Sequence, residues 1–161
     1  MIIRRAVSED LESIHEVLDK AKTFMESTGN HSQWKGPDHP WNSVPGDIEK
    51  GTGYVLENDG KVCGYFALIT GEDPCYKIID GKWLDSELPY AAIHRVASDG
   101  SCRGLVDEIL NFAFRRINNI RIDTHEDNGP MRHKLDKLGF TYCGTVWMSD
   151  GTPRRAYQKN I

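Results

Sequence analysis

The stretch that decides the fold is "YAAIHRVASDGSCRGLVDEILNFAFRRINNIRIDT", residues 90–124. A β-prone run, residues 90–98, is followed by a polar glycine turn, residues 99–104, and then by apolar residues at helical spacing. Residues 119–125 alternate between apolar and polar side chains, which is typical of another strand. A strand, a helix and a strand within about 35 positions form a βαβ unit, which implies a parallel strand pair and a right-handed crossover. The apolar face of the helix comprises Leu105, Val106, Ile109, Phe112, Ala113 and Ile117.

The flanking sequence predicts antiparallel strands and three more helices. Apolar residues from Leu11 to Phe24 recur at helical spacing after a short N-terminal strand, and a short helix is expected at residues 47–50. Residues 53–69 read as a hairpin turning at Asn-Asp-Gly. A helix at residues 128–139 and two final strands complete the chain. We therefore expect an α/β (α+β mixed sheet) fold of order β-α-(α)-β-β-β-α-β-α-β-β with one central parallel strand pair, as a single domain at residues 1–161.

Composition narrows the classes of function. The 161 residues are 39% hydrophobic and 27% charged, with a net charge of −4, which does not favour a nucleic-acid partner. No apolar run approaches the ~20 residues of a membrane helix, and "MIIRRAVSED" lacks the apolar core of a secretion signal. The four cysteines are scattered without a CxxC pair, which favours reduced thiols. We expect a cytoplasmic protein with no membrane or nucleic-acid partner, as a monomer or a homodimer.

The glycine turn before the central helix has a chemical consequence. The first N–H groups of a helix have no intrahelical partner and carry partial positive charge, so a helix that starts after such a turn favours an anion. Gly104 allows a close approach to the backbone there. An ordinary helix start remains the alternative. The sequence lacks the Gly-Lys-Ser/Thr ending of a P-loop and the G-x-G-x-x-G spacing of a Rossmann turn.

Together with the order of the elements, two motifs resemble the GNAT-type N-acyltransferases over essentially the full chain. In that family, a loop of pattern Q/R-x-x-G-x-G/A cradles the pyrophosphate of acetyl-CoA at a helix start. The matching loop here runs from Ser101 to Val106, with Gly104 at the central glycine. Ser101 stands where the family usually has Arg or Gln, and Val106 where it has Gly or Ala. The second signature, NxxxxxxLxKLGF, matches residues 128–140.

The resemblance implies acetyl-CoA as co-substrate and a set of residues that bind it. The backbone of Val96 and Ala97 would pair with the pantetheine arm, and Arg103 could supply the positive charge that Ser101 lacks. Asn128 would lie beside the arm, although capping the last helix is an equally natural role for it. The implied cofactor-binding residues are Val96, Ala97, Ser101, Cys102, Arg103, Gly104, Leu105, Val106 and Asn128.

The catalytic groups are less clearly marked. Attack of an amine on a thioester requires a neutral amine, which a general base can provide. The tyrosine that often assists the departing thiolate in this family is replaced by Leu135, and the family's common carboxylate falls near Tyr90. Local substitutes are His94, Glu87 and Tyr90. Histidine titrates near neutrality, but His94 could equally be a packed strand residue; alternation places it on the opposite face from Arg95. Catalysis by positioning with a water-relayed proton also remains open.

The expected function is therefore transfer of an acetyl (acyl) group from acetyl-CoA to a primary amine of a small molecule or of a protein or peptide, by direct attack on the thioester. The alternative is a non-catalytic acyl-CoA-binding module with a degenerate site. We expect no metal, because His125, Glu126, Asp127 and His133 lack ligand spacing and are typical of solvated positions. No suitably spaced Cys/His motif supports Cys102 as a nucleophile.

Overall fold

A computed structural model describes residues 1–36 and 39–161 of the chain. Its strands and helices are β1 (Ile2–Arg5), α1 (Leu11–Ser27), α2 (Val44–Lys50), β2 (Gly53–Asn58), β3 (Lys61–Thr70), β4 (Asp80–Gly81), β5 (Ala91–Ser98), α3 (Leu105–Phe114), β6 (Asn119–Thr124), α4 (Gly129–Lys137), β7 (Thr141–Trp147) and β8 (Pro153–Asn160). The short 3-10 turns are η1 (Ser8–Asp10), η2 (Trp41–Ser43) and η3 (Pro74–Tyr76). Among the described residues, no helix is long and apolar enough to cross a membrane.

The strands form one 8-stranded sheet of order β1-β2-β3-β5-β6-β8-β7-β4. Within the described residues, β5 and β6 are the parallel pair and the other neighbours are antiparallel. The mixed sheet with one central parallel pair is therefore confirmed. The sequence did not predict β4, a two-residue strand on the edge of β7, because an element so short has no periodicity to detect.

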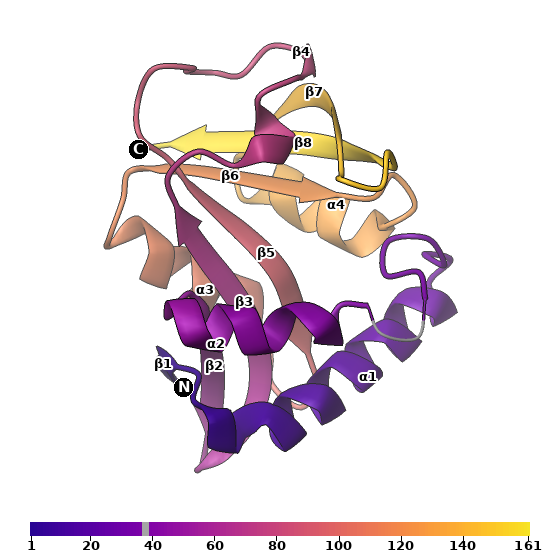
Figure 1. Cartoon of the computed structure of the whole chain (residues 1–161), viewed down its shortest axis with the longest axis vertical. Coiled ribbons are helices and arrows are strands. Elements are labelled where there is room, and N and C mark those ends of the chain that lie inside the picture. Colours follow the sequence, from indigo (N-terminus) through magenta and orange to yellow (C-terminus); the bar gives the residue numbers. More distant parts are fainter. Residues whose placement is uncertain (37–38) are drawn as a thin grey trace.

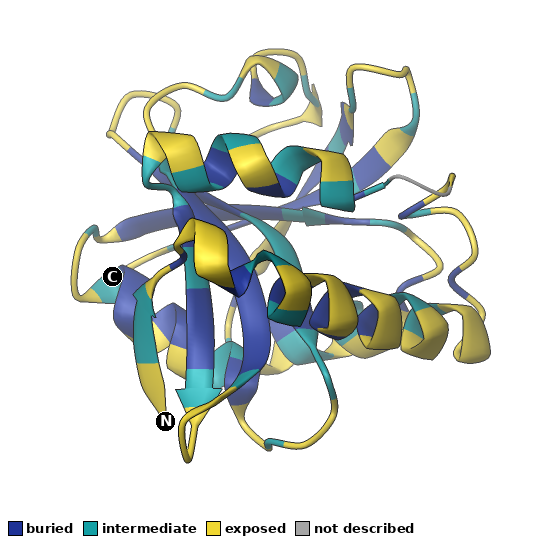
Figure 2. Ribbon diagram, turned by 60° about the horizontal axis from the view of Figure 1, so that its bottom comes forward, coloured by how far each residue is buried: buried dark blue, intermediate teal, exposed yellow. Residues whose placement is uncertain are grey.

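Helices cover both faces of the sheet. Figure 1 shows α1 and α2 over one face and α3 and α4 over the other. On the first face Ile14 and Leu18 pack against Tyr65, and on the second Ile109 and Leu135 belong to the larger core cluster. Figure 2 shows the result, with buried central strands and helices whose outer surfaces are exposed.

The parallel strands β5 and β6 separate partway along their length (Figure 1). Their register covers Ala91, Ala92 and Ile93 of β5 and stops there. Beyond that point β5 stays paired with β3 as far as Ser98, and β6 stays paired with β8 as far as Thr124. Each strand therefore has one backbone edge without a strand neighbour, and the gap between these edges positions the candidate site.

Candidate functional site

The start of α3 presents a run of backbone amides to solvent. Gly104 caps the helix in the left-handed conformation, with φ 73° and ψ 15°, and the first intrahelical bond runs from the Glu108 amide to the Gly104 carbonyl at 3.0 Å. Within residues 1–36 and 39–161, the amides of residues 102–107 donate to no protein acceptor. Unpaired amides at a helix start bind an anion with several converging hydrogen bonds.

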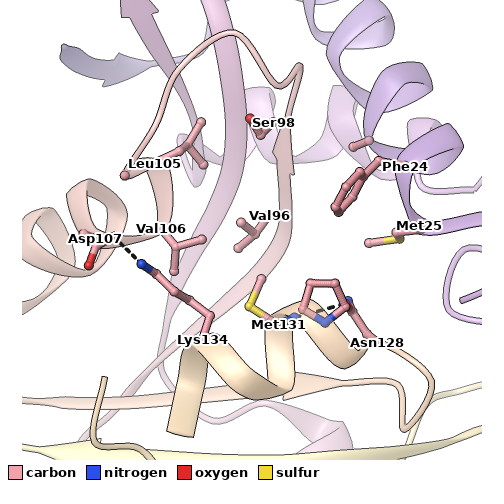
Figure 3. A pocket seen from close by; sticks show the side chains of 13 residues that line it. Phe24, Met25, Val96, Ser98, Leu105, Val106, Asp107, Asn128, Met131 and Lys134 are labelled. Atoms are coloured by element: carbon pink, nitrogen blue, oxygen red, sulfur yellow. Dashed lines mark hydrogen bonds and ion pairs between the residues drawn. The ribbon is translucent and has the colours of Figure 1, made fainter. Parts of the chain in front are cut away.

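Residues 104–107 of this run border a cavity of about 330 Å³, here called the α3 cavity. Figure 3 shows apolar side chains from several elements converging on it, among them Phe24 and Met25 of α1, Val96 of β5 and Met131 of α4. The sequence predicts Phe24 on the packed face of α1, yet it is 57% exposed and lies at the rim of this cavity. A ligand in the α3 cavity would therefore cover apolar surface that the fold leaves open.

The sequence-predicted cofactor residues divide into two groups. Val96, Gly104, Leu105, Val106 and Asn128 line the α3 cavity. The other four do not line it.

Each of the four has a different environment. Ala97 is buried among the residues under α1. Ser101 is exposed and donates both its amide and its hydroxyl to Asp99, at 2.8 and 2.6 Å. Cys102 packs against the core, and Arg103 is exposed. The backbone amide of Cys102 or Arg103 can still reach an anion that its side chain does not touch.

Asn128 both caps α4 and lines the α3 cavity. Its side-chain oxygen accepts a hydrogen bond from the Met131 amide at 3.2 Å, which is the capping role. Its amide nitrogen donates to Oε1 of Gln33 at 3.0 Å. The two roles proposed for Asn128 are therefore compatible.

Lys134 is a charged residue of this cavity that the sequence did not single out. Its ammonium forms a 2.6 Å ion pair with Asp107 between α4 and α3 (Figure 3). Its position in a helix, four residues before Leu138, gives it no distinguishing signal in the sequence.

A second, smaller cavity of about 110 Å³ adjoins the first. We call it the His94 cavity. It shares Met25, Val96, Asn128 and Met131 with the α3 cavity, so the two are neighbours in the gap between β5 and β6. The rest of its lining comprises Gln33, Trp34, His39, Ile93, His94, Arg95, Ile122, Asp123, Thr124, Met148 and Arg154.

His94 lies between two carboxylates. Its Nε2 is 2.7 Å from Oδ2 of Asp73, within hydrogen-bond distance, and its Nδ1 is 3.6 Å from Oδ2 of Asp123. Donation of the Nε2 proton to Asp73 assigns the tautomer in which Nδ1 carries a free lone pair. Asp123 lines the His94 cavity and Asp73 does not. The free nitrogen of the imidazole therefore faces the cavity, while the nitrogen that carries the proton faces away from it.

Neighbouring groups form hydrogen bonds to both carboxylates, Asp73 and Asp123. Burial would raise the pKa of Asp73, but the hydrogen bond and charge of His94 and the amide of Cys75 together lower it, so Asp73 stays ionised. Tyr76 donates its hydroxyl to Asp123 at 2.6 Å. Burial, followed by the charge of Asp123, raises the pKa of Tyr76, so this hydroxyl remains a donor.

The two other candidate catalytic residues lie outside this cluster. Tyr90 is buried, and its hydroxyl accepts a hydrogen bond from the Asp73 amide at 2.7 Å. Tyr90 thus holds the segment that carries Asp73. Glu87 is exposed, lines neither cavity, and its amide donates to Asp85 at 2.8 Å. The structure therefore brings Tyr90 close to His94 through Asp73 and leaves Glu87 apart.

A bulge in β5 places His94 and Arg95 on the same face, which corrects the expectation from alternation. Ala67 of β3 pairs with His94, and Tyr65 pairs with Ala97. One residue of β3 therefore lies opposite two residues of β5 between these pairs, so β5 contains an extra residue. Arg95 occupies this extra position with φ 55°, a backbone conformation that residues other than glycine rarely adopt.

The side chain of Arg95 explains why the bulge is tolerated. It makes two hydrogen bonds to Asp47 of α2, at 2.9 and 2.6 Å, and the buried Tyr65 donates to the same carboxylate at 2.6 Å. Burial, with the hydrogen bond to Asp47, raises the pKa of Tyr65 and keeps its donor proton in place. This network fixes the backbone immediately after His94.

Sequence reasoning missed Asp73, Asp123 and Arg154. Asp73 lies in a segment without periodicity. Its one local signal is the following Pro74, because Asp73 caps the 3-10 turn η3 that begins at Pro74. Asp123 shares its strand face with other polar residues, and Arg154 is one of two adjacent arginines in β8. Nothing in their spacing links them to His94. Within the described part of the chain, no three His, Cys, Asp or Glu side chains converge as metal ligands would.

Comparison with solved structures gives a consistent set of similar folds. No protein-family model and no curated protein matches the chain. Among solved structures, a GNAT-family acetyltransferase from Streptococcus agalactiae is 35% identical, with a TM-score of 0.89 over 99% of this chain and 95% of the other. A GNAT-family acetyltransferase from Listeria monocytogenes is 19% identical, with a TM-score of 0.73 over 99% and 94%. A ribosomal-protein-alanine N-acetyltransferase from Brucella melitensis is 18% identical, with a TM-score of 0.62 over the whole of both chains.

Proposed function

The chain belongs to the GNAT family of acetyltransferases, and on that premise we propose that it transfers an acetyl group from acetyl-CoA to a primary amine by direct attack. The observation that carries the proposal is the place where β5 and β6 separate. At that gap the open amides of α3 and the His94 cluster border adjoining cavities.

The residues around the α3 cavity fit the parts of acetyl-CoA. The amides of residues 102–107 can donate hydrogen bonds to the diphosphate, which needs several donors and a site free of bulky side chains. The free edge of β5 at Val96 offers backbone groups to the amides of the pantetheine arm, and Phe24 and Met131 offer apolar cover. Lys134 can exchange Asp107 for a phosphate, because its ion pair is partly exposed. When bound, acetyl-CoA supplies an acetyl group already activated as a thioester.

His94 is suited to the role of general base. An amine that enters the His94 cavity can donate one proton to Nδ1 and another to Asp123, because these two acceptors are 3.6 Å apart. Asp73 holds the imidazole in the required tautomer and stabilises its positive charge once it takes the proton. A bound ammonium first gives one proton to His94, which passes it to solvent, and so becomes the neutral amine that attacks. As the new C–N bond forms and the C–S bond breaks, the nitrogen loses a second proton to solvent, and the departing sulfur takes one proton from solvent.

The departing sulfur does not require a dedicated acid on the protein. Leu135, at the position where the family often has tyrosine, is fully buried in the core and can donate no proton. A thiol has an unperturbed pKa of ~8.5, so a thiolate leaves readily and can take its proton from water. The proposal therefore assigns protonation of the sulfur to solvent.

The compartment follows from the co-substrate. Acetyl-CoA is an intracellular metabolite, and the four cysteines are all free thiols, which suits a reducing environment. We therefore propose that the protein works in the cytoplasm.

Release of free thiol from acetyl-CoA tests the function. With a panel of primary amines, at least one acceptor should raise thiol release well above the rate with acetyl-CoA alone, and the acetylated amine should appear in equal amount by mass spectrometry. Binding of acetyl-CoA without thiol release for any small amine, diamine or peptide would contradict the proposal and favour a non-catalytic acyl-CoA-binding module.

A further inference from the structure

A buried arginine at the start of β8 lines the His94 cavity, and no acidic side chain among the described residues pairs with it. Arg154 is 7% exposed, and its guanidinium donates to the carbonyls of Pro153 and Gln33, both at 2.9 Å, and to Oγ1 of Thr152 at 3.3 Å. All of these acceptors are neutral. No carboxylate in residues 1–36 or 39–161 forms an ion pair with it. A buried charge of this kind is costly unless a counter-ion reaches it.

The other basic groups of the cavity do not compete with Arg154 for an anion. Arg95 is already paired with Asp47. Burial, followed by the charges of Arg154 and Arg95, lowers the pKa of His39, so its ring is neutral. Within the described part of the chain, Arg154 is therefore the cation of this cavity that no acidic side chain neutralises.

The cavity also contains a negative charge. Asp123 lines the same cavity beside His94, and its charge acts on Arg154 without forming an ion pair. Apolar side chains, including Trp34 and Met148, make up much of the remaining wall. The cavity thus offers an acidic group, a basic group and apolar walls.

The size of the cavity limits what can occupy it. At about 110 Å³, the His94 cavity is well below the ~300–1,000 Å³ of sites for drug-sized ligands. A small molecule fits this volume better than a peptide segment with its flanking residues. An acidic and a basic group in one cavity suit an occupant that carries both an ammonium and an anionic group.

We propose that the acceptor is a small amino-carboxylate, with its amine between His94 and Asp123 and its carboxylate paired with Arg154. This inference rests on the proposed function and names the substrate class of the same site. The guanidinium offers the carboxylate two parallel hydrogen-bond donors, which an amine without a carboxylate cannot use. Arg154 then sets specificity, while His94 acts on the reacting nitrogen.

The test compares each amino-carboxylate with the amine that lacks its carboxylate. Glycine, β-alanine, 4-aminobutyrate and L-methionine are paired with methylamine, ethylamine, propylamine and 3-methylthiopropylamine, and kcat/KM is measured by thiol release. For at least one pair, the wild type should favour the carboxylate at least ~10-fold, the scale of a lost hydrogen bond to a charged group. Arg154→Gln should bring that ratio towards one. Arg155→Gln is the matched control, because Arg155 lies next in β8, contacts Tyr157 and Tyr142, and does not line the His94 cavity.

The outcomes separate this inference from the proposed function. If Arg154→Gln lowers both members of a pair equally, Arg154 is only structural and the inference is wrong. If amines without a carboxylate, diamines or peptides are acetylated faster than every amino-carboxylate, the inference is also wrong, while the proposed acetyltransferase function is supported. Absence of thiol release with every amine contradicts the proposed function itself. Should Arg154→Gln fail to fold, Arg154→Lys keeps the charge and should give an intermediate ratio; an unchanged ratio would overturn the inference.

Discussion

Replacing His94 with alanine is expected to lower kcat by roughly 10²-fold or more, the usual scale of general-base catalysis, with little change in the KM for acetyl-CoA. The imidazole presents Nδ1 to the cavity and holds its other nitrogen 2.7 Å from Asp73. Because the pKa of Asp73 is lowered, its carboxylate remains ionised throughout a neutral assay range and continues to fix the tautomer.

Two further variants make the His94 result decisive. Asp73→Asn should keep His94 in place and reduce kcat by a smaller factor, because the imidazole loses its charged partner. His125→Ala is the matched control, because His125 also lies within 3.6 Å of a carboxylate, Asp127, but does not line the His94 cavity. Turnover is measured per folded molecule. A near-wild-type kcat in folded His94→Ala would remove His94 from the mechanism.

Gly104→Val is expected to abolish detectable acetyl-CoA binding in a domain that still folds. Gly104 lines the α3 cavity, and apart from its chain neighbours no atom of residues 1–36 or 39–161 lies within 4 Å of where a Cβ would stand. A valine side chain would therefore enter the space beside the open amides and block the diphosphate. Its φ of 73° also strains a β-branched residue, at a cost of about 1–2 kcal/mol in stability. Titration calorimetry measures the binding, and thermal unfolding measures the strain.

Gly151→Val is the control that separates the effect of backbone strain on stability from the loss of acetyl-CoA binding. Gly151 has φ 82° and equally open space, but it lies between β7 and β8 and does not line the α3 cavity. It should lose a similar amount of stability and bind acetyl-CoA like the wild type. If folded Gly104→Val also binds like the wild type, the assignment of residues 102–107 to the diphosphate is wrong.

The sequence predicted the parts of the fold that local patterns determine. The β5–α3–β6 unit and the Gly104 helix start follow from periodicity and turn chemistry, and both are present. The bulge at Arg95 could not be predicted, because it depends on the Asp47 carboxylate 48 positions earlier in the chain. Strict alternation therefore failed at the residue next to His94.

The candidate site was predicted only in part for a similar reason. His94 was found because its strand leads into the helix start. Asp73 and Asp123, which give His94 its geometry, come from a segment without periodicity and from the neighbouring strand. Arg154 reaches the same cavity from β8. Only the tertiary fold brings these three charges together, so no spacing in the sequence could reveal them.

The central claim is that the start of α3 binds the diphosphate of acetyl-CoA and so delivers the thioester to the gap beside His94. Titration calorimetry with acetyl-CoA and with acetyl-pantetheine, which has the same thioester arm but no diphosphate, tests it most directly. Several charge-assisted hydrogen bonds from residues 102–107 should make acetyl-CoA bind at least ~100-fold more tightly. Equal affinity for the two ligands would contradict the claim.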